Sequence, residues 1–200
     1  GWARPGLASA KALVAGGARV HAWDDNDASR AAAEAAGVPV SDINSRDWRS
    51  FAALVLSPGV PLRFPEPHRV VTLAEATGVP IVSDIELFAR AVNALPAAQR
   101  PKLIGVTGTN GKSTTAALIA HILNEAGKDV RLGGNIGAAM LEQPPLHAGA
   151  YYVIELSSFQ LDLTSSLRLD VAGWRNLSAG RLDRDGTMAS YGAATQRIGV

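Results

Sequence analysis

The segment GVTGTNGKST, residues 105–114, constrains the fold of this chain more than any other feature. It sets three glycines and one lysine between the apolar run KLIGV and a helical pattern that extends from Lys112 to Ala126. A glycine-rich turn from a strand into a helix points backbone N–H groups toward an anion, which the start of the helix also attracts. The segment therefore predicts a phosphate-binding loop in an α/β fold with a mostly parallel sheet.

The loop carries the side chains that a nucleotide site needs. Lys112 can neutralise charge on the terminal phosphates of ATP, and the hydroxyl of Ser113 can reach a magnesium ion. The spacing departs from the pattern G-x-x-x-x-G-K-S, because Val106 stands where the first glycine is expected. A tight turn without a ligand is the alternative, but such a turn needs no lysine and serine after its last glycine. The predicted ATP-binding residues are Gly108, Thr109, Asn110, Gly111, Lys112, Ser113 and Thr114.

A single carboxylate follows another apolar segment. Glu155 comes at the end of the predicted strand YYVIEL, where a charge is costly unless it meets a cation or a hydrogen-bond donor. Open α/β sheets bind their ligands at the carboxyl ends of the strands. We therefore predict that Glu155 is a metal ligand together with Ser113, and a catalytic residue together with Lys112. The alternative is a surface glutamate that starts a loop.

Each of the other polar residues near this predicted sheet edge has two possible roles. Asn135, in the segment GGNIG, either forms a turn or turns its amide toward a ligand. Ser157, Ser158 and Gln160 either cap the next helix or contact a substrate. The residues alone leave both choices open.

Predicted strands and helices alternate along the chain, which favours parallel sheets covered by helices. The segment ALPAAQRPK contains two prolines and no apolar period, so residues 94–101 are the predicted linker between a domain at 1–93 and a second domain at 102–200. The predicted helices cover 7–14, 28–37, 68–78, 84–95, 112–126 and 161–167, and the predicted strands cover 19–23, 52–59, 80–83, 102–106, 129–132, 151–156 and 170–174.

Composition excludes several classes of function. Lysine plus arginine (19) almost balance aspartate plus glutamate (18), so we expect no nucleic-acid partner. The sequence has no cysteine and no apolar run of roughly 18 residues, so we expect a cytoplasmic protein without a membrane span. It begins without methionine and stops without a helix-ending signal, which indicates a piece of a longer protein.

Taken in order, the motifs carry a resemblance to a known family. GVTGTNGKST, GGNIG, ELSSFQLD and NLS followed by LDRDGT resemble the Mur ligases, and LSPG and DIELF favour the branch of that family that adds D-glutamate. The resemblance covers all 200 residues. It implies a Rossmann-like domain that binds a UDP sugar, here at 1–93 without its first strand. It also implies part of a central P-loop-like ATPase domain at 102–200 and a C-terminal domain that is absent.

The same resemblance implies a reaction of peptidoglycan precursor synthesis. ATP, with Mg2+, would phosphorylate the carboxylate of UDP-N-acetylmuramoyl-L-alanine, and the amine of D-glutamate would displace the phosphate from this acyl phosphate. By resemblance, Lys112, Ser113, Asn135 and Glu155 match family positions for that work. We expect the protein to act as a monomer.

The resemblance also assigns substrate-binding residues. In the first domain, Asp24, Asp25 and Asn26 fall where the family holds uracil. Ser57, Pro58 and Gly59 fall where backbone amides meet the diphosphate. These roles are expectations from the resemblance alone.

Two positions of the second domain depart from the family pattern. Arg181 replaces a magnesium-binding histidine, and Thr195 replaces the lysine that carries a carbamate and supports the second metal. Both changes make the site more positive, so a second Mg2+ should bind poorly. We expect weak nucleotide binding without completed ligation; the alternative for Arg181 is a solvent-facing side chain on a loop.

Two other functions compete with the ligase. One is a nucleotide-binding module derived from a Mur ligase that has lost catalysis. The other is a different P-loop ligase, such as a relative of folylpolyglutamate synthase, which LSPG and DIELF argue against.

Overall fold

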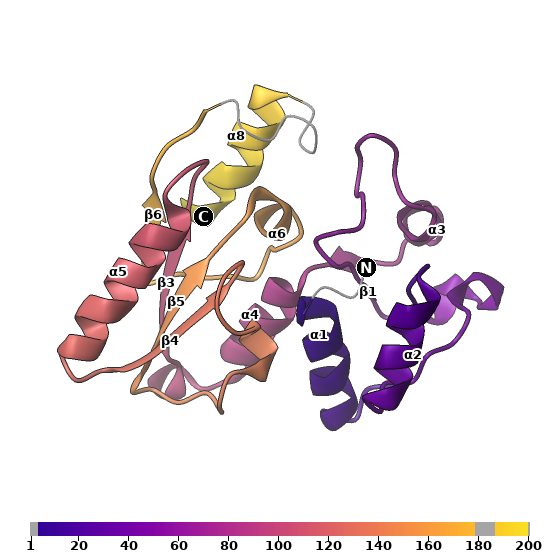
Figure 1. The fold of residues 1–200 in the computed structure, drawn as a ribbon, viewed down its shortest axis with the longest axis horizontal. Helices are drawn as coiled ribbons and strands as arrows, with labels where there is room; N and C mark the ends of the chain where they lie inside the picture. The colour runs from indigo at the N-terminus through magenta and orange to yellow at the C-terminus, as the bar shows by residue number, and fades with distance from the viewer. Residues whose placement is uncertain (1–3, 179–186, 200) are drawn as a thin grey trace. The chain divides into compact units, whose positions relative to one another are not determined.

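The computed structural model describes residues 4–178 and 187–199 (Figure 1). The chain divides into two compact units, Gly1–Asp84 and Ile85–Val200. Helices and parallel strands alternate in both units, which confirms the predicted α/β fold class. Among the described residues, none of the helices is both long and apolar enough to span a bilayer.

The first unit is built from short elements around a small sheet. Strands β1 (Leu54–Val55) and β2 (Ile81–Val82) pair in parallel, with Leu54 opposite Ile81. Helix α3, which connects them, ends at Gly78 in the left-handed conformation. The remaining elements of the unit are α1 (Arg4–Ala15), α2 (Asp27–Ala35), η1 (Ile43–Ser45), η2 (Trp48–Ser50) and α3 (Arg69–Thr77).

The strand predicted at residues 19–23 is wrong. Only Ala22 pairs in this segment, through an isolated parallel bridge to Val40. The N–H of Ala22 donates to the carbonyl of Pro39, and the N–H of Ser41 donates to the carbonyl of Ala22. The next bond of such a ladder would need an N–H on Pro39, which proline lacks. The ladder therefore cannot extend from this pair toward residue 20.

The second unit contains a four-stranded sheet in the order β4-β5-β3-β6, in which every pair is parallel. Helix α5 follows β3 and leads to β4, so the chain crosses over β5 between these strands. The strands are β3 (Lys102–Thr107), β4 (Asp129–Gly134), β5 (Ala150–Glu155) and β6 (Val171–Trp174). The helices are α4 (Asp84–Ala94), η3 (Ala97–Gln99), α5 (Lys112–Glu125), η4 (Met140–Glu142), α6 (Ser158–Asp162), α8 (Met188–Gln196) and η5 (Arg197–Gly199).

The two faces of this sheet pack against different helices. Along β5, Val153 joins the cluster that contains Ala116 of α5, whereas Tyr152 and Ile154 join the cluster that contains Phe88 of α4. This alternation follows from the two-residue period of a strand. Figure 1 shows α5 lying along the sheet. Burial on both faces explains why β5 reads as a continuous apolar run.

Helix α4 packs with the second unit through a buried carboxylate. Glu86 is 1% exposed, and its carboxylate accepts hydrogen bonds from the backbone N–H groups of Ser165 (2.8 Å) and Ser166 (2.9 Å), from Ser166 Oγ (2.6 Å) and from Arg90 Nε (2.8 Å). The compact units divide between Asp84 and Ile85, after the first residue of α4, whereas the linker predicted at 94–101 begins at the last residue of this helix. The domain roles assigned to the two parts stay predictions.

Helix α6 begins earlier than predicted. The expected span was 161–167, but α6 covers Ser158–Asp162. Ser157 and Gln160 form a capping box, in which each side chain bonds to the backbone N–H of the other residue. This reciprocal cap fixes the helix start directly after β5.

Candidate nucleotide and metal site

The glycine loop leads from β3 into α5, as the sequence predicts. Gly111 is the N-cap of α5 and has a φ of 76°, a left-handed conformation that residues with a Cβ rarely adopt. Lys112, Ser113 and Thr114 form the first turn of the helix, so their backbone N–H groups have no acceptor within the helix. The loop thus presents donors and the positive end of a 14-residue helix in one place.

The lysine of the loop folds back over the loop itself. Lys112 Nζ donates hydrogen bonds to the carbonyl oxygens of Gly108 (2.6 Å) and Thr109 (3.0 Å). Its ammonium group is therefore held directly above the turn. Ser113 and Thr114 are exposed at the start of α5.

Glu155 lies at the same edge of the sheet as the loop. It is the last residue of β5, where it is opposite Val106 of β3 and Gly134 of β4. Thr107 Oγ1 and the N–H of Leu156 bond across the same two strand ends, to the carbonyls of Leu156 (2.8 Å) and Val106 (2.9 Å). The expected juxtaposition of Glu155 with the strand that feeds the loop is therefore present.

The carboxylate of Glu155 is buried and only half satisfied. Glu155 is 1% exposed, and its Oε1 accepts a hydrogen bond from Asn135 Nδ2 at 2.9 Å. Its Oε2 has no hydrogen-bond partner among the described residues. A buried carboxylate oxygen without a donor is costly unless a cation is bound to it. This oxygen fits a hard divalent cation such as Mg2+, which prefers carboxylate and hydroxyl oxygens.

Asn135 approaches Glu155 through both its side chain and its backbone. The N–H of Asn135 donates to the carbonyl of Glu155 over 2.9 Å, in addition to the side-chain bond. The preceding Gly134 permits this approach, because a Cβ there would lie 2.2 Å from the same carbonyl oxygen. Asn135 thus lies in a bend with its amide bonded to Glu155, and a contact of this amide with a ligand stays a prediction.

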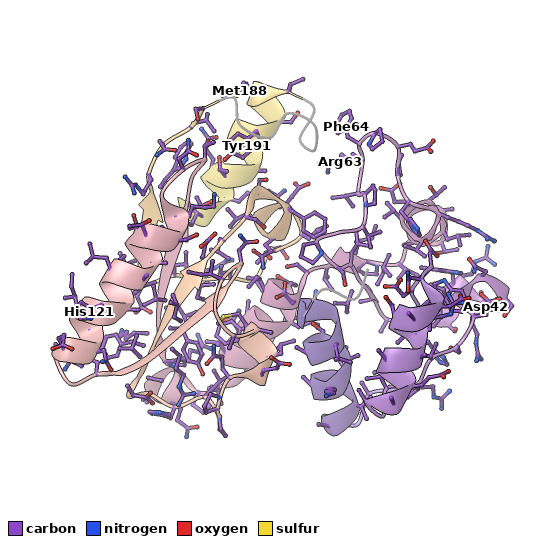
Figure 2. All side chains as sticks on the ribbon, viewed as in Figure 1. Asp42, Arg63, Phe64, His121, Met188 and Tyr191 are labelled. Carbon is purple, nitrogen blue, oxygen red and sulfur yellow. The ribbon has the colours of Figure 1, made fainter. Side chains whose placement is uncertain are left out.

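The tip of the loop also contacts residues that the sequence analysis does not single out. Thr109 Oγ1 lies 3.1 Å from the hydroxyl of Tyr191, which Figure 2 shows on α8. Asn176 and Arg175, which follow β6, bond to Asn110 and Gly111. Asn176 belongs to the motif NLS, which was the only signal of these contacts in the sequence.

A metal site built only from clustered acidic and histidine side chains is not found among residues 4–178 and 187–199. His121, for example, is exposed on α5 (Figure 2). The cation site suggested by Glu155 and Ser113 would therefore need further oxygens from a bound ligand or water.

Comparisons with known proteins identify the family. The family model of the Mur ligase middle domain matches residues 106–199, the part that contains the loop and Glu155. UDP-N-acetylmuramoylalanine--D-glutamate ligase of Phenylobacterium zucineum is 59% identical over 99% of this chain, and the same-named protein of Brucella abortus is 51% identical over 96%. The chain belongs to the Mur ligase family.

This Mur ligase chain spans about 42% of the length of the Phenylobacterium relative and 41% of the Brucella relative. Among solved structures, it is similar to UDP-N-acetylmuramate:L-alanyl-gamma-D-glutamyl-meso-diaminopimelate ligase from Neisseria meningitides, with a TM-score of 0.55 and 19% identity over 96% of this chain and 63% of that one. At this identity the similarity extends to the fold.

The serine and glutamine residues after β5 cap helix α6 of the Mur ligase fold. Gln160 is 1% exposed, and its Oε1 accepts from the backbone N–H and the hydroxyl of Ser157. Ser158 is the first residue of the helix. The capping alternative is therefore present, while a contact of Ser157, Ser158 or Gln160 with substrate stays a prediction.

In the first unit, the three residues expected to meet uracil form a hydrogen-bonded turn. Asp24, 7% exposed, accepts from the N–H of Asn26 (2.8 Å), and Asn26 caps α2 by accepting from Ser29. Asp25 Oδ2 lies 2.8 Å from His68 Nε2. This hydrogen bond holds the pKa of Asp25 below its ordinary value, despite partial desolvation.

Ser57, Pro58 and Gly59 form the turn that follows β1. The N–H of Val60 donates to the carbonyl of Ser57 over 3.0 Å. The space beside Gly59 is open, because a Cβ built there meets no atom within 4 Å. Binding of a diphosphate at this turn stays a prediction.

Of the two positions that depart from the Mur ligase pattern, Arg181 lies outside the described residues. Thr195 lies in α8 with an exposed fraction of 0%, and its hydroxyl donates to the carbonyls of Tyr191 (2.9 Å) and Gly192 (3.0 Å). The side chain is therefore bonded within its own helix.

Proposed function

We propose that this chain supplies the nucleotide-binding site of an ATP-dependent ligase that joins D-glutamate to UDP-N-acetylmuramoyl-L-alanine through an acyl phosphate. The curated relatives named as D-glutamate ligases support this substrate pair. The observation that carries the proposal is the buried, half-satisfied carboxylate of Glu155 beside the phosphate-binding loop. The proposed protein is a cytoplasmic monomer.

The residues of the loop would bind the phosphates of ATP. Lys112 Nζ is held by two neutral carbonyl oxygens, of Gly108 and Thr109. Charged phosphate oxygens form stronger hydrogen bonds with an ammonium group than neutral carbonyl oxygens do. The lysine can therefore leave the two carbonyl oxygens and bind a phosphate. The backbone N–H groups of Gly111 to Thr114 would meet further phosphate oxygens.

Ser113 and Glu155 would hold Mg2+, whose charge offsets the repulsion between the phosphates and the substrate carboxylate when it is bound. Asn135 donates to Oε1 of Glu155 and so leaves Oε2 for the cation. Such a donor fixes the orientation of a metal-binding carboxylate. Asn135 is therefore proposed to position Glu155.

The first unit would bind the UDP part of the substrate. The turns at 24–26 and 57–59 follow the bridged residue Ala22 and strand β1, which ends at Val55. Both turns lie beyond carboxyl ends of parallel segments, where open α/β folds bind nucleotides. We propose uracil at Asp24 to Asn26 and the diphosphate at Ser57 to Gly59.

A second candidate function is a nucleotide-binding protein that does not complete ligation. The observation that favours it is Thr195, whose buried hydroxyl is engaged by its own helix and which has no amine to form a carbamate. With Arg181 in place of a histidine, the second metal would lack two expected ligands. The two candidates share ATP binding and differ in turnover.

The ligase proposal is tested by nucleotide binding and by turnover. Isothermal titration of the chain with ATP and Mg2+ should give binding that the substitution Lys112→Met weakens about a hundredfold. Absence of binding in the unsubstituted chain would refute the proposal. Titration with UDP-N-acetylmuramoyl-L-alanine separates it from a folate-dependent relative, which should not bind a UDP sugar.

Turnover separates the two candidates. The chain would be extended with the C-terminal part of the Phenylobacterium relative, and incorporation of radioactive D-glutamate would be measured with and without the paired substitution Arg181→His and Thr195→Lys. A gain of ligation only in the paired variant supports a ligase with an impaired metal site. Lack of activity in both forms, with nucleotide binding intact, supports the binding protein.

A further inference from the structure

The two residues after β6 hold the tip of the phosphate-binding loop. The side-chain amide of Asn176 forms a reciprocal pair with the backbone of Asn110: Oδ1 accepts from the N–H at 3.0 Å, and Nδ2 donates to the carbonyl at 3.1 Å. The carbonyl of Asn176 also accepts from the N–H of Thr109 at 3.1 Å. The ladder between β3 and β6 is thus continued beyond both strands, onto the loop.

Arg175 holds the next peptide group. Its backbone N–H donates to Thr107 at 3.1 Å, which fixes the start of the side chain at the end of β3. Its guanidinium Nη1 donates to the carbonyl of Gly111 (3.2 Å) and to Oγ1 of Thr115 (3.0 Å). A Cβ on Gly111 would lie 2.2 Å from this nitrogen, so the guanidinium lies directly against the glycine.

These contacts fix the directions of the N–H groups that a phosphate would meet. The carbonyl and the N–H of one planar peptide group point in opposite directions. Holding the carbonyls of Asn110 and Gly111 therefore orients the N–H groups of Gly111 and Lys112. A hydrogen bond to the carbonyl also polarises the peptide and strengthens its N–H as a donor.

The backbone N–H groups of the loop fall into two sets. The N–H groups of Thr109 and Asn110 are engaged by Asn176, whereas those of Gly111 and Lys112 come from the peptide groups whose carbonyls Asn176 and Arg175 hold. All these contacts join groups of the protein itself. A loop that is ordered before binding loses less conformational entropy when the ligand arrives.

We propose that Arg175 and Asn176 are positioning residues that hold the phosphate-binding loop in its binding conformation before a nucleotide arrives. This inference rests on the proposed binding of ATP by the loop. Neither residue needs to touch the nucleotide, since each acts through a peptide group of the loop.

The test compares Arg175→Met and Asn176→Ala with the unsubstituted chain. Without nucleotide, amide hydrogen exchange measured by NMR should become faster at residues 109–112 and stay unchanged at Val153 and Ile154 of β5. The Kd for ADP with Mg2+, measured by titration calorimetry, should rise about tenfold to a hundredfold, because each variant removes two hydrogen bonds at the loop and the start of α5.

Arg168→Met is the matched control. Arg168 is exposed, precedes β6 as Arg175 follows it, and also donates two hydrogen bonds from Nη1, in its case to the backbone carbonyls of Ser165 and Leu167. The substitution Arg168→Met should change neither the amide exchange rates at residues 109–112 nor the Kd for ADP. Arg175→Lys retains the charge without the planar guanidinium and should behave like Arg175→Met.

Three results would overturn the inference. Unchanged exchange in the loop with unchanged affinity shows that neither residue positions it. Weaker ADP binding without faster exchange, or full affinity in Arg175→Lys, shows that the charge of Arg175 acts on the nucleotide directly. If the unsubstituted chain does not bind ADP, the proposed nucleotide site fails, while the exchange rates still decide whether the loop is held by these residues.

Discussion

Asn135 donates a hydrogen bond from Nδ2 to one carboxylate oxygen of Glu155 over 2.9 Å, and the other oxygen of this carboxylate has no hydrogen-bond partner in the described part of the chain. The amide therefore selects which oxygen stays available to a cation. Because Glu155 is 1% exposed, bulk water cannot easily solvate the second oxygen. A substitution of Glu155 is therefore the most direct test of the proposed cation site.

Glu155→Gln should remove the effect of Mg2+ on the protein. Glutamine can still accept from Asn135 through its carbonyl oxygen, but it places a neutral amide where the cation would bind. In the absence of metal, the free energy of unfolding should stay within about 1 kcal/mol of the unsubstituted chain or exceed it, because a buried unpaired charge has been removed. Urea unfolding with ADP, at several Mg2+ concentrations, measures both quantities. An equal stabilisation by Mg2+ in the variant would contradict the assignment.

Lys112→Met should weaken nucleotide binding with little effect on stability. The substitution removes hydrogen bonds from Nζ to Gly108 and Thr109, which contribute about 0.5 to 1.5 kcal/mol each at most. The loss of charge at the phosphates should raise the Kd for ATP about a hundredfold, or roughly 3 kcal/mol. Titration calorimetry measures the Kd.

Lys102→Met is the control for this prediction. Lys102 begins the strand whose other end leads into the loop, and it pairs with Asp170 at 2.7 Å. The Lys102→Met variant should bind ATP with the same Kd as the unsubstituted chain. Equal losses in the two variants would mean that ATP binding depends on overall charge and not on the loop lysine.

Gly111→Ala should lower the affinity for ATP, whereas Gly127→Ala should leave it unchanged. Both glycines have a left-handed φ, of 76° and 70°, so alanine costs about 1 to 2 kcal/mol of backbone strain at either position. Only at Gly111 does the new Cβ collide with another residue, at 2.2 Å from Arg175 Nη1, whereas the space beside Gly127 is open. Thermal unfolding should give similar small losses of stability, while the affinity for ATP should fall only in Gly111→Ala. Equal affinities in the two variants would refute the close packing of Arg175 on the loop.

Glu86 should make the second unit sensitive to acid. Burial raises the pKa of Glu86, but the hydrogen bonds from Ser166, Ser165 and Arg90 outweigh it and lower the pKa from 4.5 to about 2. The ionised form is favoured in the folded state, so this stabilisation is complete above about pH 4.5 and is lost as the pH falls toward 2. At about 1.4 kcal/mol per pKa unit, it amounts to roughly 3 kcal/mol.

Glu86→Gln should therefore lower the free energy of unfolding near neutral pH by about 2 to 4 kcal/mol, because its amide places a donor against donors of Ser165 and Ser166. The difference between the two proteins should shrink between pH 4.5 and pH 2. Urea unfolding at a series of pH values measures it. A difference that does not change across this range would show that Glu86 is not the group that titrates.

In the second unit, the four strands and helix α5 were predicted from the sequence because their signals are local, whereas α6 was misplaced and α8 was not predicted. Each strand of its sheet is an apolar run bounded by turns, and the glycine loop marks the passage from β3 to α5. The placement of Glu155 beside that loop followed from the rule that parallel strands end at one edge. The roles assigned to Lys112, Ser113 and Glu155 stay predictions that the experiments above address.

Other features depend on contacts that the local sequence does not encode. The strand predicted at residues 19–23 has an apolar pattern, but its extension needs an N–H from Pro39 in another segment. Arg175 and Gly111 are 64 positions apart, and only the pairing of β6 with β3 brings them together. The burial of Glu86 is likewise fixed by serines 79 and 80 positions away.

Strand β5 occupies an interior position in its sheet, with β4 on one side and β3 on the other. Its last residue, Glu155, is consequently anchored by two ladders at once and cannot shift without breaking both. The backbone of the proposed metal ligand is thus fixed by the sheet. Any adjustment to an incoming nucleotide is therefore expected from side chains, such as the long, unbranched side chain of Lys112, and not from the backbone of Glu155.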